Sequence, residues 1–316
     1  MRRSIAGLGR TLVTLGLLIL LFVAYQLWGT GIFTARAQAS LEDDFEAAQD
    51  AYAAAETTTT VPDDDPTVAG PDPTTPTTVA RTFAAELPPL VEGEQAGHIL
   101  IPKIGSDWYF VEGTSRQDLK KGPGHYPGTP MPGQVGNAAI AGHRTTYGAP
   151  FNRLDELAPG DEIIITTWVG EYTYKVRDVP FPVKPDQTEV VQNTPDISQL
   201  TLTTCHPKFS ARERLIVVAD LVVQESSPPT DGALFHGEEP APAIEPDALS
   251  EGLEGEQKSL GLTYQWGAIA AVVGLAWWWF FRRWRHPLTW VVGVIPFLAV
   301  LFGFFVYLER ALPAGI

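Results

Sequence analysis

Three long apolar segments determine how this chain of 316 residues can be organised, because each of them must be removed from water. Thr11–Trp28 contains no charged residue, and Leu262–Phe281 and Leu288–Leu308 form two further apolar segments near the C-terminus. At roughly 1.5 Å per helical residue, segments of about 20 residues cross a bilayer core of about 30 Å. The sequence therefore predicts one transmembrane helix before a long polar region and two after it.

Basic residues beside these segments set the expected orientation of the chain. Arg2, Arg3 and Arg10 precede the first segment, and Arg282–His286 separates the last two. Because loops rich in lysine and arginine stay in the cytoplasm, we expect a cytoplasmic N-terminus and an extracellular region from about residue 30 to 260. The protein is therefore expected in the cell membrane, as a multi-pass protein whose central domain lies outside.

A cleaved signal peptide is the alternative interpretation of the first segment. Ala37-Gln38-Ala39 resembles a small-residue cleavage site. However, the apolar run is longer than the roughly 7–15 residues typical of such a peptide, which favours an uncleaved anchor. The region that follows is exported under both interpretations.

The composition of the exported region changes along its length and divides the chain into parts. Residues 36–96 are acidic and rich in proline and threonine, as in Thr57–Pro66 and Pro71–Thr78. Such a segment buries too little apolar surface to offset its conformational entropy, so we expect a disordered linker, with a short helix over Ala39–Ala55 at most. Glu225–Lys258 has a similar composition.

The expected parts are residues 1–35 (cytoplasmic N-terminus and first transmembrane helix), 36–96 (linker), 97–223 (extracellular folded domain), 224–260 (tether) and 261–316 (two transmembrane helices with a basic cytoplasmic loop).

The pattern of residues 97–223 is typical of short strands separated by turns. Apolar and β-branched residues occur in short runs bounded by glycine and proline, whereas helical signals are few. The expected strands include His98–Ile101, Trp108–Val111, Asp161–Trp168, Tyr172–Val176, Gln199–Thr204 and Leu215–Val223, and the expected short helices are Ser115–Lys120 and Pro150–Leu157. We therefore expect a mainly β fold, a small closed β-barrel with short helices, joined to transmembrane helices at both ends.

The net charge and the cysteine count exclude several functions. The formal net charge is −15, with acidic runs in the exported region, which argues against a nucleic-acid partner. Cys205 is the only cysteine, so no disulfide forms within the chain and an exported free thiol needs an explanation. The sequence lacks zinc-, phosphate- and calcium-binding motifs, and we expect no cofactor and no metal, with weak calcium binding by the acidic loops left open as an alternative. The alternative interpretation of Cys205 is a buried cysteine without a chemical role.

Polar side chains lie at the ends of three predicted strands. His143 and Cys205 each follow an apolar run, and Arg212 and Arg214 open the run after Cys205. A thiol becomes a strong nucleophile as a thiolate, which a nearby imidazolium or guanidinium stabilises. We therefore expect an acyl-transfer enzyme that passes through a thioester on Cys205. Both arginines lie on the same face of an extended strand, so alternation does not choose between them.

These residues resemble the catalytic signature of a known family. Gly142-His143-Arg144, Leu202-Thr203-Thr204-Cys205 and Arg214-Leu215-Ile216-Val217 look like the three motifs of sortases, the membrane-anchored cysteine transpeptidases of Gram-positive bacteria. The motifs occur in the family's order, and the resemblance covers residues 97–223. It implies a sortase-type β-barrel, and it selects Arg214 rather than Arg212.

The loop sequences point to a subclass. Gly122–Thr129 and Thr203–Pro207 look most like class E, the housekeeping sortases of actinobacteria. Two C-terminal apolar segments are not part of the minimal family pattern, and a C-terminal span also occurs in the pilus-building class C. A class C-like sortase therefore stays open as an alternative.

The resemblance implies a role for each site residue. Cys205 attacks the threonine carbonyl of a sorting signal of the form L-P-x-T-G or L-A-x-T-G, and His143 protonates the departing glycine amine. An amine of a peptidoglycan precursor then attacks the thioester. Arg214 holds the substrate backbone and stabilises the oxyanion. Thr204, beside the nucleophile, adds a hydroxyl donor, and Tyr126 favours alanine over proline in the substrate, with ordinary loop packing as the alternative reading of Tyr126. The implied partners are exported proteins with such signals, the peptidoglycan amine and the membrane.

Other functions fit the sequence less well. Papain-like peptidases place the cysteine before the histidine, whereas His143 precedes Cys205 here, and the serine-histidine-glycine-cysteine string of other cell-wall transpeptidases is absent. Hydrolysis of the thioester by water stays open. A non-catalytic, membrane-tethered cell-wall binding module would tolerate loss of a catalytic residue, but this sequence retains all three. His98 and His206 are interpreted as structural.

Overall fold

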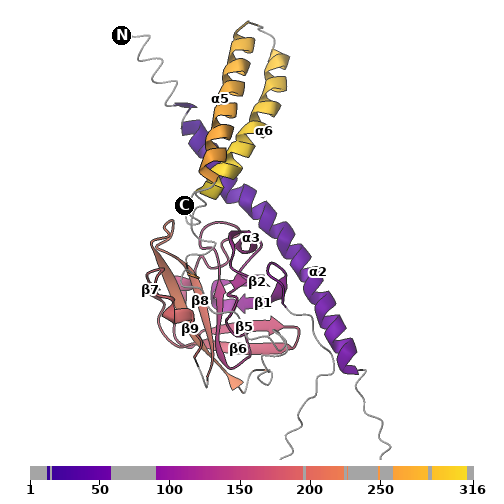
Figure 1. The fold of residues 1–316 in the computed structure, drawn as a ribbon, viewed down its shortest axis with the longest axis vertical. Coiled ribbons are helices and arrows are strands. Elements are labelled where there is room, and N and C mark those ends of the chain that lie inside the picture. The colour runs from indigo at the N-terminus through magenta and orange to yellow at the C-terminus, as the bar shows by residue number, and fades with distance from the viewer. Residues whose placement is uncertain are drawn as a thin grey trace, which may run out of the picture.

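A sheet of short strands occupies the middle of the chain, and the two ends contribute long helices (Figure 1). The computed structural model describes residues 13–14, 16–57, 90–194, 197–223, 226, 248–249, 259–283 and 287–311. The expectation of a mainly β fold is confirmed for this part of the chain, and helices lie at both ends of the sequence, but that the N-terminal helix crosses a membrane stays a prediction.

The strands close into a barrel. Among the described residues they are β1 (Gln95–Ile101), β2 (Ser106–Glu112), β3 (Gly124–His125), β4 (Gly136–Ala141), β5 (Glu162–Thr167), β6 (Gly170–Val176), β7 (Phe181–Val183), β8 (Ser198–His206) and β9 (Glu213–Leu221). Their order is β6-β5-β1-β2-β3-β4-β8-β9-β7, and a further pairing of β6 with β9 closes the ring, with β7 attached to β9. The pairs β2–β3 and β4–β8 are parallel, and the other pairs are antiparallel.

Two apolar clusters lie on opposite sides of the β4–β8–β9 wall. Ile140, Leu202 and Val217 belong to the core inside the barrel. Their strand neighbours Cys205 and Ile216 belong to a second cluster on the outer side. The second cluster forms because successive side chains of a strand point to opposite faces, and both faces of β8 and β9 are covered.

Short helices complete the domain. The predicted helix at Ser115–Lys120 is confirmed as α3 (Arg116–Leu119), with Ser115 as its N-cap. The prediction over Pro150–Leu157 was too long, because only the 3₁₀ turn η3 (Leu154–Glu156) forms there. Two further 3₁₀ turns are η2 (Pro102–Ile104) and η4 (Thr188–Val191).

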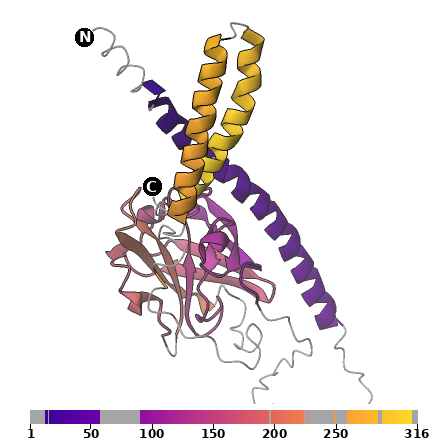
Figure 2. The ribbon, with the colours of Figure 1, turned by 45° about the horizontal axis from the view of Figure 1, so that its top comes forward.

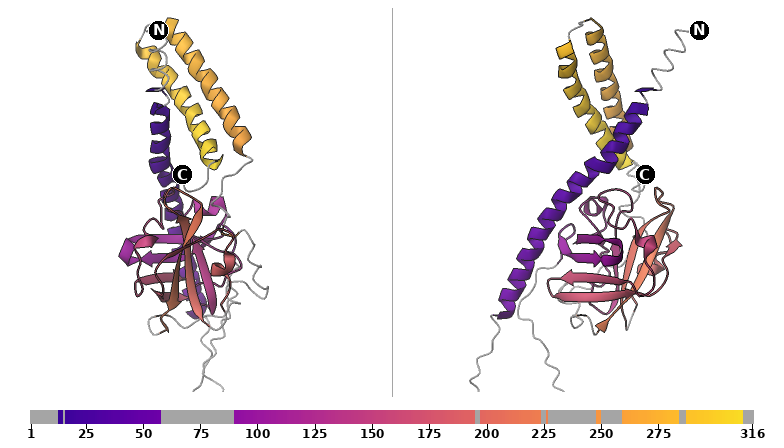
Figure 3. Two further views of the ribbon diagram at one scale, coloured as in Figure 1. Left: turned by 90° about the vertical axis from the view of Figure 1, so that its left-hand side faces the viewer. Right: turned by 180° about the vertical axis from the view of Figure 1, so that it is seen from behind.

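The helix at the N-terminal end differs from the predicted linker. A disordered linker with at most a short helix over Ala39–Ala55 was expected from residue 36 onward, but residues 36–57 all belong to the longer helix α2 (Thr30–Thr57), which follows the π-helical turn η1 (Tyr25–Gly29). Figure 3 shows α2 running along the side of the barrel. The rest of the predicted linker, residues 58–89, lies outside the described residues.

Contacts with the barrel explain why α2 is helical. Leu41 and Phe45, one helical turn apart, are both buried, and the Phe45 ring lies 5.5 Å from the ring of Tyr109. The Gln38 amide donates to the Tyr109 carbonyl at 2.8 Å and accepts from the Tyr109 N–H at 2.8 Å. This packing gives α2 tertiary stabilisation, which is the main source of helix stability in folded proteins.

The C-terminal helices form an antiparallel hairpin whose lower end meets the barrel near α3 (Figure 2). They are α5 (Ser259–Arg283) and α6 (Pro287–Ala311). In the described part of the chain, the helix Leu260–Phe280 is long and apolar enough to cross a membrane, and Val294–Glu309 is a shorter apolar helix. The N-terminal helix joins them through ring contacts of Phe22 with Phe305 and of Tyr25 with Phe302. The first predicted span, residues 11–28, is described only in part.

Candidate active site

The parallel pairing of β4 with β8 brings the predicted histidine and cysteine to the same edge of the barrel. Ala141 of β4 is in register with Thr203 of β8. Just beyond, the Gly142 N–H donates to the Thr203 carbonyl at 3.0 Å. His143 and Cys205 each lie two residues beyond the Ala141–Thr203 pair, so both residues extend from the same end of this ladder.

Gly142 is required at this edge because a ring occupies the space beside it. A β-carbon at Gly142 would lie 2.5 Å from a carbon of the Phe151 ring, which is closer than real contacts allow. Phe151 is fully buried and its N–H donates to the His143 carbonyl at 3.1 Å. The glycine of the motif therefore allows the loop after β4 to fold back beneath His143.

Arg214 lies directly opposite Cys205. The two residues are partners in the antiparallel β8–β9 register. Arg214 is fully buried, whereas Arg212 precedes β9 and is exposed. The structure therefore brings Arg214, and not Arg212, to the thiol.

Most of the Arg214 guanidinium is held by backbone carbonyls. Its Nη1 donates to the carbonyls of Ala211 (3.0 Å) and Glu213 (3.1 Å), and its Nε donates to the carbonyl of Leu249 at 2.6 Å. Among the described residues, the buried Nη2 has no hydrogen-bond partner. This nitrogen is a preorganised donor for an oxyanion.

Arg144 is part of the site, although the sequence analysis gave it no role. Its Nη1 donates to the Cys205 carbonyl at 3.0 Å and to His206 Nδ1 at 3.0 Å, and its Nη2 pairs with Asp155 at 3.0 Å. The signal in the sequence was a cation directly after His143. His206 binds Arg144 here, in line with its structural interpretation.

The Cys205 thiol is more basic than an ordinary cysteine in this arrangement. Burial raises its pKa, while the guanidinium groups of Arg214 and Arg144 lower it, and burial has the larger effect. At neutral pH the closed site therefore holds a protonated thiol beside two cations that favour its ionisation.

Thr204 and Tyr126 use their hydroxyl groups within the protein. Thr204 Oγ1 donates to the Gly142 carbonyl at 2.7 Å, so in this structure it joins the ends of β4 and β8, and its expected role as a donor toward substrate stays a prediction. Tyr126 Oη shares a hydrogen bond of 2.9 Å with Thr203 Oγ1, and its ring lies in the same apolar cluster as Cys205.

The loop that carries Tyr126 is anchored by a buried ion pair. His125 Nδ1 lies 2.7 Å from Glu112 Oε2, and its Nε2 contacts Thr129 Oγ1 at 2.9 Å. Burial lowers the pKa of His125, but the Glu112 carboxylate and the hydrogen bonds raise it further, and the net direction is upward. The pair anchors the loop one residue before Tyr126, whose hydroxyl bonds to Thr203 of β8.

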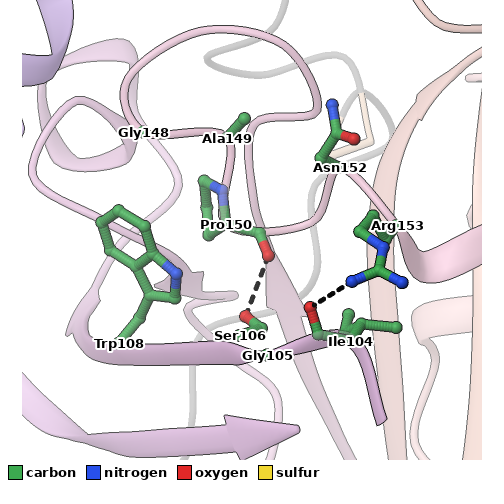
Figure 4. A pocket seen from close by; sticks show the side chains of 9 residues that line it. All are labelled: Ile104, Gly105, Ser106, Trp108, Gly148, Ala149, Pro150, Asn152 and Arg153. Carbon is green, nitrogen blue, oxygen red and sulfur yellow. Dashed lines mark hydrogen bonds between the residues drawn. The ribbon is translucent and has the colours of Figure 1, made fainter. Parts of the chain in front are cut away.

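A small open pocket lies elsewhere and contains none of the predicted site residues (Figure 4). Its volume is about 140 Å³, and Ile104, Gly105, Ser106, Trp108, Gly148, Ala149, Pro150, Asn152 and Arg153 line it. Hydrogen bonds from Ser106 to the Pro150 carbonyl and from Arg153 to the Ile104 carbonyl cross it. This pocket is therefore separate from the residues at the β4–β8–β9 edge that the sequence singled out.

A closed β-barrel with cysteine, histidine and arginine on neighbouring strand ends corresponds to the cysteine transpeptidases that the motifs indicated. The model of the sortase domain matches residues 99–222. The chain is 30% identical to sortase SrtE2 of Streptomyces coelicolor over 71% of this chain and 84% of the relative. It is also 30% identical to sortase SrtE1 of the same organism over 68% of this chain, but it spans only 56% of that relative's length.

The chain therefore belongs to the sortase family and is similar to its class E members. Among solved structures, sortase E of Streptomyces avermitilis is 37% identical, with a TM-score of 0.40, over 44% of this chain and 93% of that one.

We expect alkylation of Cys205 by iodoacetamide to be slow at neutral pH and to accelerate at alkaline pH. Only the thiolate reacts, and burial holds the pKa of Cys205 above its ordinary value. Arg144→Met removes a cation that lowers this pKa, so the midpoint of the rate–pH curve should move upward. The exposed Arg212 supplies the control Arg212→Met, which should leave the midpoint unchanged. A wild-type midpoint at or below that of a free cysteine would contradict this account.

Proposed function

We propose that this protein is a membrane-anchored sortase that cleaves an L-A/P-x-T-G sorting signal between threonine and glycine and transfers the protein to a cell-wall amine. The observation that supports the proposal is the strand register: Arg214 pairs with Cys205, and His143 and Cys205 each follow the last β4–β8 pair by two residues. Membership of the sortase family supports the same chemistry.

The first half-reaction forms a thioester. Cys205 Sγ attacks the threonine carbonyl carbon, and its proton passes to His143. The tetrahedral oxyanion is stabilised by Nη2 of Arg214, which has no other partner among the described residues. The C–N bond then breaks as His143 returns the proton to the glycine nitrogen, because an amine leaves poorly unless it is protonated.

The second half-reaction transfers the acyl group. The amine of a peptidoglycan precursor attacks the thioester carbonyl, and His143 takes its proton. The C–S bond breaks, and the cysteine is restored. Arg144 contributes a fixed positive charge near the sulfur and holds the Cys205 backbone, so it supports ionisation without contacting the acceptor.

The membrane arrangement follows from the apolar segments. Both basic clusters lie in the cytoplasm, and the catalytic domain lies outside, where exported proteins and peptidoglycan precursors meet. The helix Leu260–Phe280 supports a C-terminal anchor. A multi-pass arrangement keeps the barrel close to the membrane surface, which suits a substrate retained at the membrane.

We expect the full-length protein in detergent to join an L-A-x-T-G peptide to an added amine, and Cys205→Ala to abolish product. His143→Ala and Arg214→Ala should each lower turnover by at least about 10²-fold, the scale for one positioned acid or oxyanion donor. Arg212→Ala is the matched control and should retain activity. The products are measured by mass spectrometry. Wild-type turnover in Cys205→Ala would contradict transpeptidation through Cys205, whereas no product from the wild-type protein would favour a non-catalytic binding module.

The subclass makes a separate prediction about specificity. We expect an L-A-x-T-G peptide to react faster than L-P-x-T-G, because proline lacks an N–H and has a fixed φ. Tyr126→Ala should narrow the preference by about ten- to a hundred-fold, the scale for one specific contact. Since the Tyr126 hydroxyl is bonded to Thr203, Tyr126→Phe should keep most of the preference. Equal rates for both peptides in the wild type would remove the class E assignment and leave the sortase assignment intact.

A further inference from the structure

Two residues of the predicted tether lie against the active site. Ala248 and Leu249 were expected to belong to an extended connection, yet their exposed fractions are 6% and 0%. Both belong to the apolar cluster on the outer face of the barrel that also contains Cys205 and Tyr126.

The backbone of this segment binds the same guanidinium that the proposed mechanism uses. Arg214 Nε donates to the Leu249 carbonyl at 2.6 Å, the shortest of its hydrogen bonds. Leu249 therefore offers the site an apolar side chain and a backbone carbonyl. The leucine of a sorting-signal peptide offers the same two groups.

The site is closed in this arrangement. The exposed fractions are 1% for Cys205, 1% for His143 and 0% for Arg214. A peptide carbonyl has to reach the sulfur, so part of this cover has to move before a thioester can form. Strands β4, β8 and β9 are held by continuous ladders, whereas Ala248 and Leu249 belong to no strand. Elements with few backbone bonds open at the lowest free energy.

The segment cannot itself be the substrate. Leu249 is followed by Ser250-Glu251-Gly252, which lacks the threonine-glycine pair that the proposed reaction cleaves. An occupant that resembles the substrate at its leucine but has no scissile bond inhibits the site reversibly.

We propose that Leu249 is an intramolecular pseudosubstrate, which occupies the place of the substrate leucine on Arg214 and leaves only when a sorting signal replaces it. This proposal rests on the proposed function for the identity of the competing ligand. As a consequence, the apparent affinity for peptide is the intrinsic affinity multiplied by the fraction of molecules in which the segment is displaced.

The test measures alkylation of Cys205 in the full-length protein, which needs no turnover. Leu249→Gln should raise the iodoacetamide rate at constant pH by about tenfold or more, the scale for burying one leucine side chain. Val223, 62% exposed, supplies the matched control Val223→Gln, which should not change the rate. Leu249→Ala should give an intermediate rate, and the thermal midpoints of all variants are compared.

A synthetic peptide of residues 244–253 provides the second arm. Added to Leu249→Gln, it should restore slow alkylation, whereas a scrambled peptide should not. A rate unchanged by Leu249→Gln, or a raised rate that the peptide does not reverse, overturns the proposal.

If alkylation follows the proposal but no sorting-signal peptide is cleaved, the proposed function fails and the occlusion stands. If the peptide is cleaved but alkylation is unchanged in Leu249→Gln, the occlusion fails and the proposed function stands.

A second observation concerns the C-terminal hairpin and the histidine. Near the end of α6, Glu309 is buried against the barrel, where its Oε1 accepts from Tyr147 Oη at 2.5 Å and its Oε2 pairs with Lys120 Nζ at 3.4 Å. Arg116 Nη1 donates to the Glu309 carbonyl at 3.3 Å. The hairpin is therefore bonded to the barrel through a buried polar cluster.

Tyr147 connects this cluster to His143. Its ring lies 5.0 Å from the imidazole, measured between centroids, and Lys120 Nζ lies 5.3 Å from its centre, within the range of a cation–π contact. Its φ of 52° is in the left-handed region, which a bulky residue adopts only when its surroundings hold it. Burial raises the pKa of Tyr147, as does the Glu309 carboxylate, so the phenol stays protonated and donates to Glu309.

We infer that Glu309 is a positioning residue that acts on His143 through Tyr147, so that the C-terminal hairpin helps to orient the acid–base group. This inference also rests on the proposed function. In full-length protein, Glu309→Ala should lower kcat about tenfold with KM within about twofold, and Glu309→Gln, which keeps an acceptor for Tyr147, should recover part of the loss. The exposed surface residue Glu162 gives the control Glu162→Gln.

The double variant Tyr147→Phe/Glu309→Ala distinguishes an effect on the position of His143 from a general loss of protein stability. Tyr147→Phe should add little further loss in a Glu309→Ala background, because both changes break one connection. The chemical shifts of the His143 ring should change in Glu309→Ala without any need for turnover. Additive losses in kcat, or unchanged His143 shifts with only a lower thermal midpoint, overturn the inference.

Discussion

The parallel ladder between β4 and β8 is the constraint on which the rest of the site depends. Their register from Gly136–Ser198 to Ala141–Thr203 puts the positions of His143 and Cys205 side by side, two residues beyond the last pair. The Thr204 hydroxyl adds a bond to the Gly142 carbonyl at that edge. Antiparallel pairing with β9 then sets Arg214 opposite Cys205. A shift by one residue would turn the thiol and the guanidinium to different faces of the sheet.

Burial and charge act against each other at the thiol. Covering Cys205 disfavours the thiolate, while two buried guanidinium groups favour it. Both cations are themselves held by backbone carbonyls, a histidine or a carboxylate, so their positions are fixed before substrate arrives. While the site is covered, burial keeps the Cys205 thiol protonated. When a substrate replaces the cover, the two guanidinium groups can favour the thiolate. The segment at Leu249 and the polar cluster at Glu309 connect this local balance to the C-terminal part of the chain.

The sequence could predict the barrel and could single out three residues of the candidate site, because both depend on local patterns. Alternating apolar runs indicated the strands, and His143, Cys205 and Arg214 each sit in a short motif at a strand end. The sequence indicated at most a short helix over Ala39–Ala55, and it could not predict that α2 is longer and lies on the barrel, because Gln38, Leu41 and Phe45 pack against residues distant in the sequence. The burial of Leu249 and the bond from Tyr147 to Glu309 are tertiary contacts of the same kind. The bond from Thr204 to the Gly142 carbonyl could not be predicted either, since adjacency to Cys205 does not show which acceptor its hydroxyl finds in the folded protein.

The central claim is that the acyl group is carried by Cys205. The most direct measurement is intact-mass and peptide-mass analysis of the full-length protein after incubation with a sorting-signal peptide in the absence of an acceptor amine. The account predicts an adduct with the mass of the peptide up to its threonine, located on Cys205 and removed by hydroxylamine or by an added amine. Peptide cleavage without any adduct on Cys205, or an adduct on another residue, would contradict it.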